Sequence, residues 1–442
     1  MSATSACRAT ISLAERFTAT RRCTLGLCKP LTAEDMMVQS CAEASPAKWH
    51  LAHTAWFFES FVLREYLPGY RLFNPDFPWL FNSYYQSFSI IPEKRLRASF
   101  SRPGLEEVLR YREHVDAGMD ELFERLGENR IEGAPAAQAL ERIELGVNHE
   151  EQHQELLLTD VLHAFFTNPL RPAYLPANSN LVGPSAARIS ALSFHDFPGG
   201  LCEVGSSAAE FCFDNERPAH RVWLDPYRLA DRMVTCGEYA AFIADGGYRR
   251  PELWLSAGWD AVRANGWGAP LYWTDTGREG GEGTGCDWTI FTLRGELPLA
   301  SLEDSPVSQI SYFEADAYGR WAGLRLPTEF EWEAAAASQA VTGNLLESER
   351  LLPAPGEEST EKPGPAQLFG DCWEWTSSAY LGYPGFKPLP GSLGEYNGKF
   401  MSGQMVLRGG SCVTPAAHIR SSYRNFFPPE TRWQFSGIRL AI

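Results

Sequence analysis

The sequence predicts a protein of two parts, an all-α bundle of four helices followed by a loop-rich α+β domain. Helical periodicity dominates up to about residue 168, and short β-like runs between Gly, Pro and Asp turns dominate from about residue 193. The intervening stretch, 169–192, is rich in Pro and Asn and weakly periodic. We therefore expect domains at 1–168 and 193–442, joined by a linker at 169–192.

Composition limits the function classes. The chain has 442 residues, enough for two or three domains, with 44% apolar and 21% charged residues, as in soluble globular proteins. A net charge of −16 argues against nucleic acid or an anionic membrane as a partner. The sequence contains no apolar run of about 18 residues, so we expect no transmembrane helix. It leaves the oligomeric state open.

The cysteines and the N-terminus indicate a cytoplasmic protein. The ten cysteines are scattered and none falls in a CxxC pair, so we expect mostly reduced thiols and no zinc knuckle. Residues 1–22 contain four Arg but no continuous apolar core, which argues against a secretory signal.

The bundle helices are marked by caps and periodicity. Ser45-Pro46 is a typical helix start, and Thr32 followed by Glu34 and Asp35 is another. From Leu105 onwards, apolar residues recur at helical spacing with charges opposite. The expected helices are 12–24, a start at 32, 48–65, one from 105, and 148–166.

The C-terminal domain shows strand-like runs interrupted by helices. The many Trp and Phe residues of the chain suit aromatic-lined pockets. The expected strands are 194–199, 201–204, 220–224 and 227–229, and the expected helices are 235–245 and 311–323.

His149 and His153 are the clearest candidate metal ligands. They are four residues apart in a helical stretch, so both lie on one helix face. Two imidazoles at that spacing suit a borderline metal such as iron, zinc or copper. Taken alone, the pair is more typical of a polar helix face with two surface histidines.

A third histidine in a second helix favours the metal site. His50 and His53 lie in an aromatic-rich helical stretch and face roughly the same way, and either one completes a three-His site. Three His on two helices of a bundle leave open metal positions, as in catalytic centres.

Several longer stretches resemble a known family. These stretches are Trp49–His53, His149–His153, Gly205–Val222, Arg325–Glu333, Gly370–Trp375 and Leu407–Arg439. With them, the C-terminal half resembles the formylglycine-generating-enzyme domain, a variant of the C-type lectin fold, and the N-terminal half resembles the DinB-like four-helix bundle. Their fusion is similar to the ergothioneine-biosynthesis sulfoxide synthases, over nearly the whole chain from about Thr24.

The resemblance implies a non-heme Fe(II) enzyme with O2 as co-substrate. The three ligands fall on His53, His149 and His153, which makes His50 a structural neighbour. A C–S bond forms at C2 of the imidazole of hercynine (Nα-trimethylhistidine). The lectin-like domain is expected to complete the substrate pocket.

The resemblance also implies the hercynine-binding residues. Gln152 matches a residue that contacts the hercynine imidazole, and Asn425, Phe426 and Phe427 match the segment that lines the pocket. Aromatic faces suit a quaternary ammonium, and Asn425 and Arg424 are candidate donors to the substrate carboxylate. A structural ion pair is the alternative for Arg424.

Tyr84 and Tyr85 are candidate catalytic residues. Iron–oxygen chemistry needs a proton or hydrogen donor near the metal, and a tyrosine supplies either. In one branch of the family a tyrosine pair has this role, and Tyr84 and Tyr85 match it. The alternative is that both are core aromatics.

The residues for the second substrate depart from the family pattern. Members carry an Arg-rich turn that holds the donor's carboxylate, and here it contains Lys94, Arg95 and Arg97. Lys does not replace Arg in bidentate carboxylate binding. Phe427 stands where users of γ-glutamylcysteine tend to have an acidic residue. We expect a cysteine-type thiol as donor, with a selenosugar, as in the related selenoneine synthases, as the alternative.

Three other function classes remain as alternatives. The bundle also resembles zinc-dependent DinB-type thiol transferases. A formylglycine-generating oxidase needs a reactive cysteine pair, for which Cys372 and Cys412 are the candidates. A lectin-like binding module leaves the three His unexplained. The identity of the metal separates these classes.

Overall fold

The computed structural model describes residues 12–83, 85–86, 91–177, 190–207, 211–277, 287–356 and 364–442. The chain forms two compact units, Met1–Leu157 and Leu158–Ile442. Helix α6 (Gly133–Thr167) therefore ends inside the second unit. The boundary expected near residue 168 coincides with the end of this helix rather than with the division between the units.

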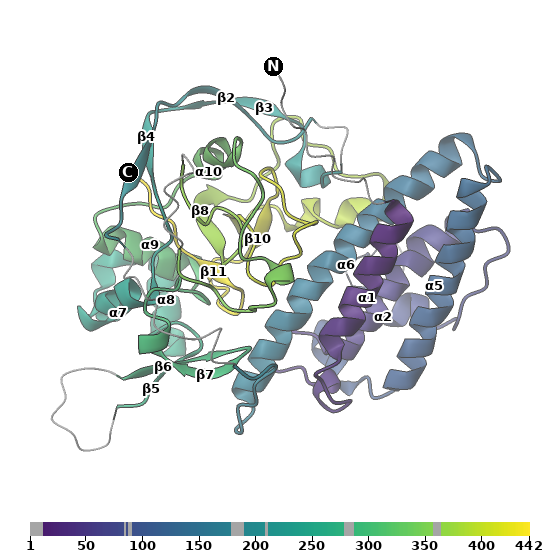
Figure 1. Ribbon diagram of the computed structural model, residues 1–442, viewed down its shortest axis with the longest axis horizontal. Helices are drawn as coiled ribbons and strands as arrows, with labels where there is room; N and C mark the ends of the chain where they lie inside the picture. The colour runs from purple at the N-terminus through teal and green to yellow at the C-terminus, as the bar shows by residue number, and fades with distance from the viewer. Residues whose placement is uncertain are drawn as a thin grey trace. The chain divides into compact units, whose positions relative to one another are not determined.

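The regular elements of the first unit are all helices within its described residues, and α1, α2, α5 and α6 run side by side in it (Figure 1). Its elements are α1 (Leu13–Cys28), η1 (Asp35–Met37), α2 (Ala47–Phe58), the π-helical η2 (Glu59–Leu63), α3 (Arg64–Tyr66), α4 (Phe77–Leu80), η3 (Lys94–Ser99), α5 (Leu105–Gly127) and α6.

The expected helix starts hold for α1, α2 and α5. Ser12 and Glu15 form a capping box at the start of α1, and Pro46 stands at the N-cap of α2. On the apolar stripe of α5, Val108, Val115, Met119 and Leu122 are buried. The start at Thr32 yields only the short turn η1, because the backbone is already extended at Val38.

Helix α6 is longer than expected and passes close to α2. A Cβ built on Gly146 would lie 2.5 Å from Cε1 of Phe58. The Phe58 ring is fully buried and packs edge-on against Phe17 at 5.0 Å, so it has little room to move. Gly146 therefore does not break the helix; it lets α6 approach α2 one turn before His149.

The second unit combines small sheets with helices. The predicted strands and the two predicted helices are present, and α9 and α10 pack on a four-stranded sheet of order β10-β9-β8-β11. The strands are β1 (Phe194–Phe197), β2 (Gly200–Val204), β3 (His220–Leu224), β4 (Tyr227–Ala230), β5 (Trp273–Asp275), β6 (Trp288–Thr292), β7 (Gly295–Pro298), β8 (Trp373–Ala379), β9 (Met405–Arg408), β10 (Asn425–Phe427) and β11 (Ser436–Gly437). The α-helices are α7 (Cys236–Ala244), α8 (Ser256–Asn265), α9 (Tyr312–Trp321) and α10 (Glu329–Ala336).

Helix α10 was missed in the sequence although its start signal is present. The Thr328 hydroxyl accepts a hydrogen bond from the Glu331 amide, and the Glu331 carboxylate accepts one from the Thr328 amide. This is a complete capping box within the stretch that carries the family resemblance.

The charged residues of that stretch are structural. Glu329 accepts hydrogen bonds from Arg408 at 2.9 Å and from Arg424 at 2.8 Å, and all three side chains are buried. Arg439 and Glu374 form a second buried pair at 2.8 Å. Burial with full pairing avoids the cost of an isolated charge.

Two expectations from composition are consistent with the structure. Within the described residues, every helix is too short or too polar to cross a lipid bilayer. Cys28, Cys202, Cys236 and Cys372 are thiols, and burial raises the pKa of Cys28 to about 12.

The close packing at Gly146 predicts that a Gly→Ala substitution has opposite effects on stability at positions 146 and 26. Gly146→Ala should lower the free energy of unfolding by about 1–3 kcal/mol, because the new Cβ overlaps the confined Phe58 ring. Gly26→Ala in α1, where nothing lies within 4 Å of the new Cβ, should raise it by up to about 1 kcal/mol. Urea unfolding measures both, and equal effects would show that packing at Gly146 is loose.

Candidate metal centre

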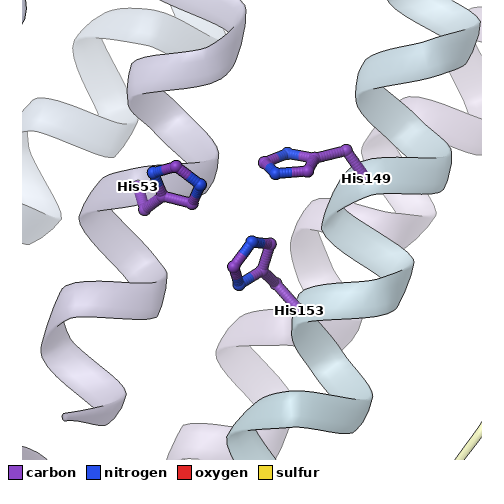
Figure 2. Close-up of side chains that lie close together, drawn as sticks. All are labelled: His53, His149 and His153. Carbon is purple, nitrogen blue, oxygen red and sulfur yellow. The ribbon is translucent and has the colours of Figure 1, made fainter. Parts of the chain in front are cut away.

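Three histidines converge inside the bundle. His53 comes from α2, and His149 and His153 come from successive turns of α6 (Figure 2). One ring nitrogen from each lies within 4.8 Å of the others, and all three side chains are buried. Within the described residues, this is the cluster that brings three potential ligand atoms together.

Hydrogen bonds select which nitrogen faces the centre. Nδ1 of His53 donates to the carbonyl oxygen of Phe81 at 2.6 Å, and its buried Nε2 has no hydrogen-bond partner among the described residues. Nδ1 of His153 lies 2.8 Å from Nδ1 of His50. For His53 the remaining lone pair is therefore on Nε2, an arrangement in which His binds a metal, and in His153 the nitrogen not engaged by His50 is also Nε2.

Two tryptophans hold the His53 ring between them. The ring stacks on Trp49 at 4.4 Å with an interplanar angle of 14°, and on Trp56 at 5.1 Å with 13°. These residues precede and follow His53 by one helical turn. Together with the Phe81 bond, the two stacks fix the orientation of the ring.

Burial favours the neutral form of the three imidazoles. Burial lowers the pKa of His149 to about 3, and burial together with the His149 neighbour lowers the pKa of His53 and His153 well below their usual range. A metal binds only the deprotonated ring, so the folded protein presents the ligands in the form that a metal needs.

A buried ion network anchors the helix that carries two of the histidines. The Glu150 carboxylate accepts hydrogen bonds from Arg21 and Arg112 at 2.9 Å and from Thr24 at 2.7 Å. Burial alone would raise the pKa of Glu150, but the two guanidinium charges outweigh it and hold the pKa at about 2. The network ties α6 to α1 and α5 next to His149.

These observations fit a metal ion. Three neutral imidazole nitrogens on two helices suit iron, zinc or copper and leave further coordination positions open. In the structure, His53, His149 and His153 are the residues that would hold it.

Of the two candidate tyrosines, the structure describes only Tyr85. Tyr84 lies outside the described residues. Tyr85 is fully buried, and its ring lies 5.6 Å from that of Trp56 and 5.0 Å from that of Phe61. Since Trp56 stacks on His53, Tyr85 belongs to the aromatic shell around the centre.

The three predicted donor-binding cations are separated. Lys94 and Arg95 are exposed, and they bond to the Glu43 carbonyl oxygen and the Glu93 carboxylate, respectively. Arg97 is buried, bonds to the hydroxyls of Ser45 and Ser83, and stacks over the Trp49 ring at 3.5 Å. Of the three, only Arg97 adjoins the metal centre. The pKa of His53 and His153 is lowered mainly by burial and by the neighbouring imidazoles, and the Arg97 charge lowers it further.

The predicted hercynine-binding residues fall on α6 and β10. Gln152 is half-buried on α6, beside His153. Asn425, Phe426 and Phe427 form β10 and are also half-buried. The Asn425 side-chain oxygen accepts a hydrogen bond from the Phe426 amide.

Arg424 is occupied by structural bonds. Its guanidinium donates to both carboxylate oxygens of Glu329 and to the carbonyl oxygens of Asn215 and Leu381, and it stacks over Tyr383. The geometry therefore favours the structural ion pair over the predicted contact with substrate.

The sequence analysis missed the two stacking tryptophans and the Glu150 network. The signal for the tryptophans is their spacing: Trp49 stands four residues before His53 and Trp56 three residues after it, which places all three rings on the same helix face. Glu150 gave no signal, because its partners Arg21 and Arg112 lie far away in the sequence.

Comparisons with known proteins agree with this architecture. Residues 193–442 match the model of the sulfatase-modifying factor enzyme 1-like domain, and residues 16–157 match that of the DinB superfamily. The chain is 34% identical over 422 residues to a hercynine oxygenase of Mycobacterium tuberculosis, covering 90% of this chain and 91% of that one. The chain belongs to the hercynine oxygenase family.

Further relatives support the assignment. A hercynine oxygenase of Mycolicibacterium smegmatis is 32% identical over 427 residues, covering 90% of this chain and 91% of the relative. Ergothioneine biosynthesis protein 1 of Schizosaccharomyces pombe is 26% identical over 286 residues, 62% of this chain and 31% of that protein. The matches confirm the predicted fusion of a DinB-like bundle with a formylglycine-generating-enzyme-like domain of C-type lectin fold, and they indicate an enzyme.

The Glu150 network predicts a large effect of one neutral substitution. Glu150→Gln should lower the free energy of unfolding by about 3–5 kcal/mol, because Arg21 and Arg112 stay buried without a countercharge. The carboxylate contribution is complete above the ordinary pKa of 4.5 and is lost as the pH falls through about 2. The difference between wild type and variant should therefore shrink over this range.

Urea unfolding at several pH values measures this effect. Glu128→Gln is the matched control, since Glu128 is exposed and pairs with the exposed Arg130; it should change stability by less than about 0.5 kcal/mol. A pH-independent difference between wild type and the Glu150→Gln variant would argue against the role of the Glu150 charge.

Proposed function

We propose that this chain is a non-heme Fe(II)- and O2-dependent enzyme that forms a carbon–sulfur bond at C2 of the hercynine imidazole, as a step in ergothioneine biosynthesis. The observation that carries the proposal is the convergence of His53, His149 and His153 as neutral ligands in a member of the hercynine oxygenase family. The overall reaction balances as imidazole C–H plus thiol plus O2 giving the sulfoxide and one water. When bound, Fe(II) would supply the O2 reactivity that redox-inactive Zn²⁺ lacks.

The chain's own residues would orient hercynine. We propose that the amide of Gln152 contacts the imidazole of the substrate and that the NH2 group of Asn425 donates to its carboxylate. The trimethylammonium group donates no hydrogen bond and suits an aromatic face. Phe427, whose ring lies 6.3 Å from that of Trp433, supplies such a face, whereas Phe426 is already stacked on Tyr380 at 4.0 Å.

The donor would be a cysteine-type thiol held by Arg97. A buried guanidinium beside the metal centre suits the carboxylate of an amino-acid thiol. One observation supports a second candidate, a selenosugar donor that gives a C–Se bond: Lys94 and Arg95 are exposed, so a single cation replaces an Arg-rich clamp. The buried thiols Cys236 and Cys372 are in keeping with a cytoplasmic enzyme.

A donor competition tests this proposal. Anaerobic protein loaded with Fe(II) receives hercynine, O2 and, in separate reactions, cysteine, γ-glutamylcysteine or a selenosugar, and mass spectrometry identifies the products. We expect a hercynine–cysteine sulfoxide that is lost in His53→Ala, His149→Ala and His153→Ala. Arg97→Leu should raise the KM for the thiol more than Arg95→Leu does, because only Arg97 is buried beside the centre.

The other outcomes would each contradict a different part of the proposal. A product from the selenosugar alone would replace the sulfur proposal with the selenium one. Turnover that requires Zn²⁺ and proceeds without O2 would indicate a thiol transferase and contradict the proposal. Full activity in any of the three His variants would remove that residue from the site.

We also propose that Tyr85 or Tyr84 donates a proton or hydrogen atom during coupling. Tyr85→Phe keeps the buried ring that packs near Trp56 and removes only the hydroxyl, so it should leave stability nearly unchanged. We expect Tyr85→Phe or Tyr84→Phe to reduce the coupled product and divert O2 consumption towards oxidation of the thiol. Unchanged product ratios in both variants would contradict the role.

A further inference from the structure

His50 makes a contact that the metal-binding role of the other histidines does not require. It lies on α2 one turn before His53, and its side chain is 2% exposed. Its Nδ1 lies 2.8 Å from Nδ1 of His153, with the ring centroids 5.1 Å apart and the planes at 56°. This is a hydrogen bond between two buried imidazoles, separated by 103 positions in the sequence.

The bond allows two proton arrangements. Each neutral imidazole carries one N–H, and the short N···N contact holds a single proton between the two Nδ1 atoms. If His153 donates, its Nε2 is a lone pair. If His50 donates, the proton of His153 is on Nε2, and that atom cannot bind a metal without losing it.

The two arrangements differ in whether the ring nitrogen of His153 that faces the metal site carries a lone pair or a proton. One ring nitrogen of His153 points into the space that it shares with His53 and His149, and the other points away (Figure 2). The nitrogen engaged by His50 is Nδ1, so Nε2 remains for the shared space. Only the arrangement in which His153 donates gives three lone pairs facing one point.

We propose that His50 is a positioning residue whose Nδ1 accepts the Nδ1–H bond of His153 and thereby fixes His153 in the tautomer with its Nε2 lone pair at the metal site. The proposal rests on the metal site of the proposed function and adds a residue to it. His53 receives the same control from the Phe81 carbonyl, which is an acceptor only. For His153 the acceptor is a side chain, so substitution can remove it.

The test compares variants that differ in the acceptor. His50→Phe keeps a ring of similar size without an acceptor, and His50→Asn keeps an oxygen near the position of Nδ1. Competition with a chelator measures the dissociation constant for Co²⁺, whose visible spectrum also reports the ligands. We expect His50→Phe to weaken binding roughly 10–100-fold and His50→Asn to weaken it less. His114→Phe, the same change at a half-buried histidine bonded to the Arg71 carbonyl oxygen, should leave binding unchanged.

A second readout needs neither metal nor turnover. In the metal-free wild-type protein, ¹⁵N NMR of labelled histidine should show His153 protonated on Nδ1 and unprotonated on Nε2. His153 protonated on Nε2 would overturn the proposal even if His50→Phe failed to fold. Unchanged Co²⁺ affinity in a folded His50→Phe would also overturn it. Absence of hercynine turnover in the wild type would defeat the proposed function and leave both of these readouts intact.

Discussion

The structure of the metal centre depends on how α6 is held against its neighbours in the bundle. Gly146 lets α6 approach the buried Phe58 ring of α2, and Glu150 ties the same helix to Arg21 and Arg112. Between them they fix the height and rotation of α6 at His149. Without this anchoring, the two histidines of α6 would have no defined partner on α2, since their spacing alone places them on one face but not opposite His53.

Burial links the stability of the bundle to the chemistry of the centre. The tryptophans on both faces of His53 exclude water, and the same desolvation lowers the pKa of the histidines so that they remain neutral. An apolar interior tolerates neutral imidazoles but not unpaired charged ones. The polar atoms that remain are directed by single hydrogen bonds, from His53 to Phe81 and between His153 and His50.

The second unit separates the residues that identify the family from those proposed to act. Glu329, Arg408 and Arg424 form a buried charge network, and Glu374 pairs with Arg439, so these residues account for the fold. The half-buried side chains of β10, which follow Arg424 in the sequence, are those proposed to contact hercynine. Long matching stretches of sequence therefore reflect the packing of the domain more than its chemistry.

Local sequence accounts for the helices with clear caps and periodicity, such as α1 and α5, for the strands β1 to β4, and for the shared face of His149 and His153. These features depend on residues a few positions apart, where spacing alone fixes the geometry. Tertiary contacts were needed to establish that His53 faces the α6 pair while His50 contacts His153 from behind, and that Arg97 is buried while Lys94 and Arg95 are exposed. These distinctions depend on contacts between segments that are distant in the chain. Several side chains project from one helical turn, and the packing of a neighbouring segment decides which of them is buried or faces the site.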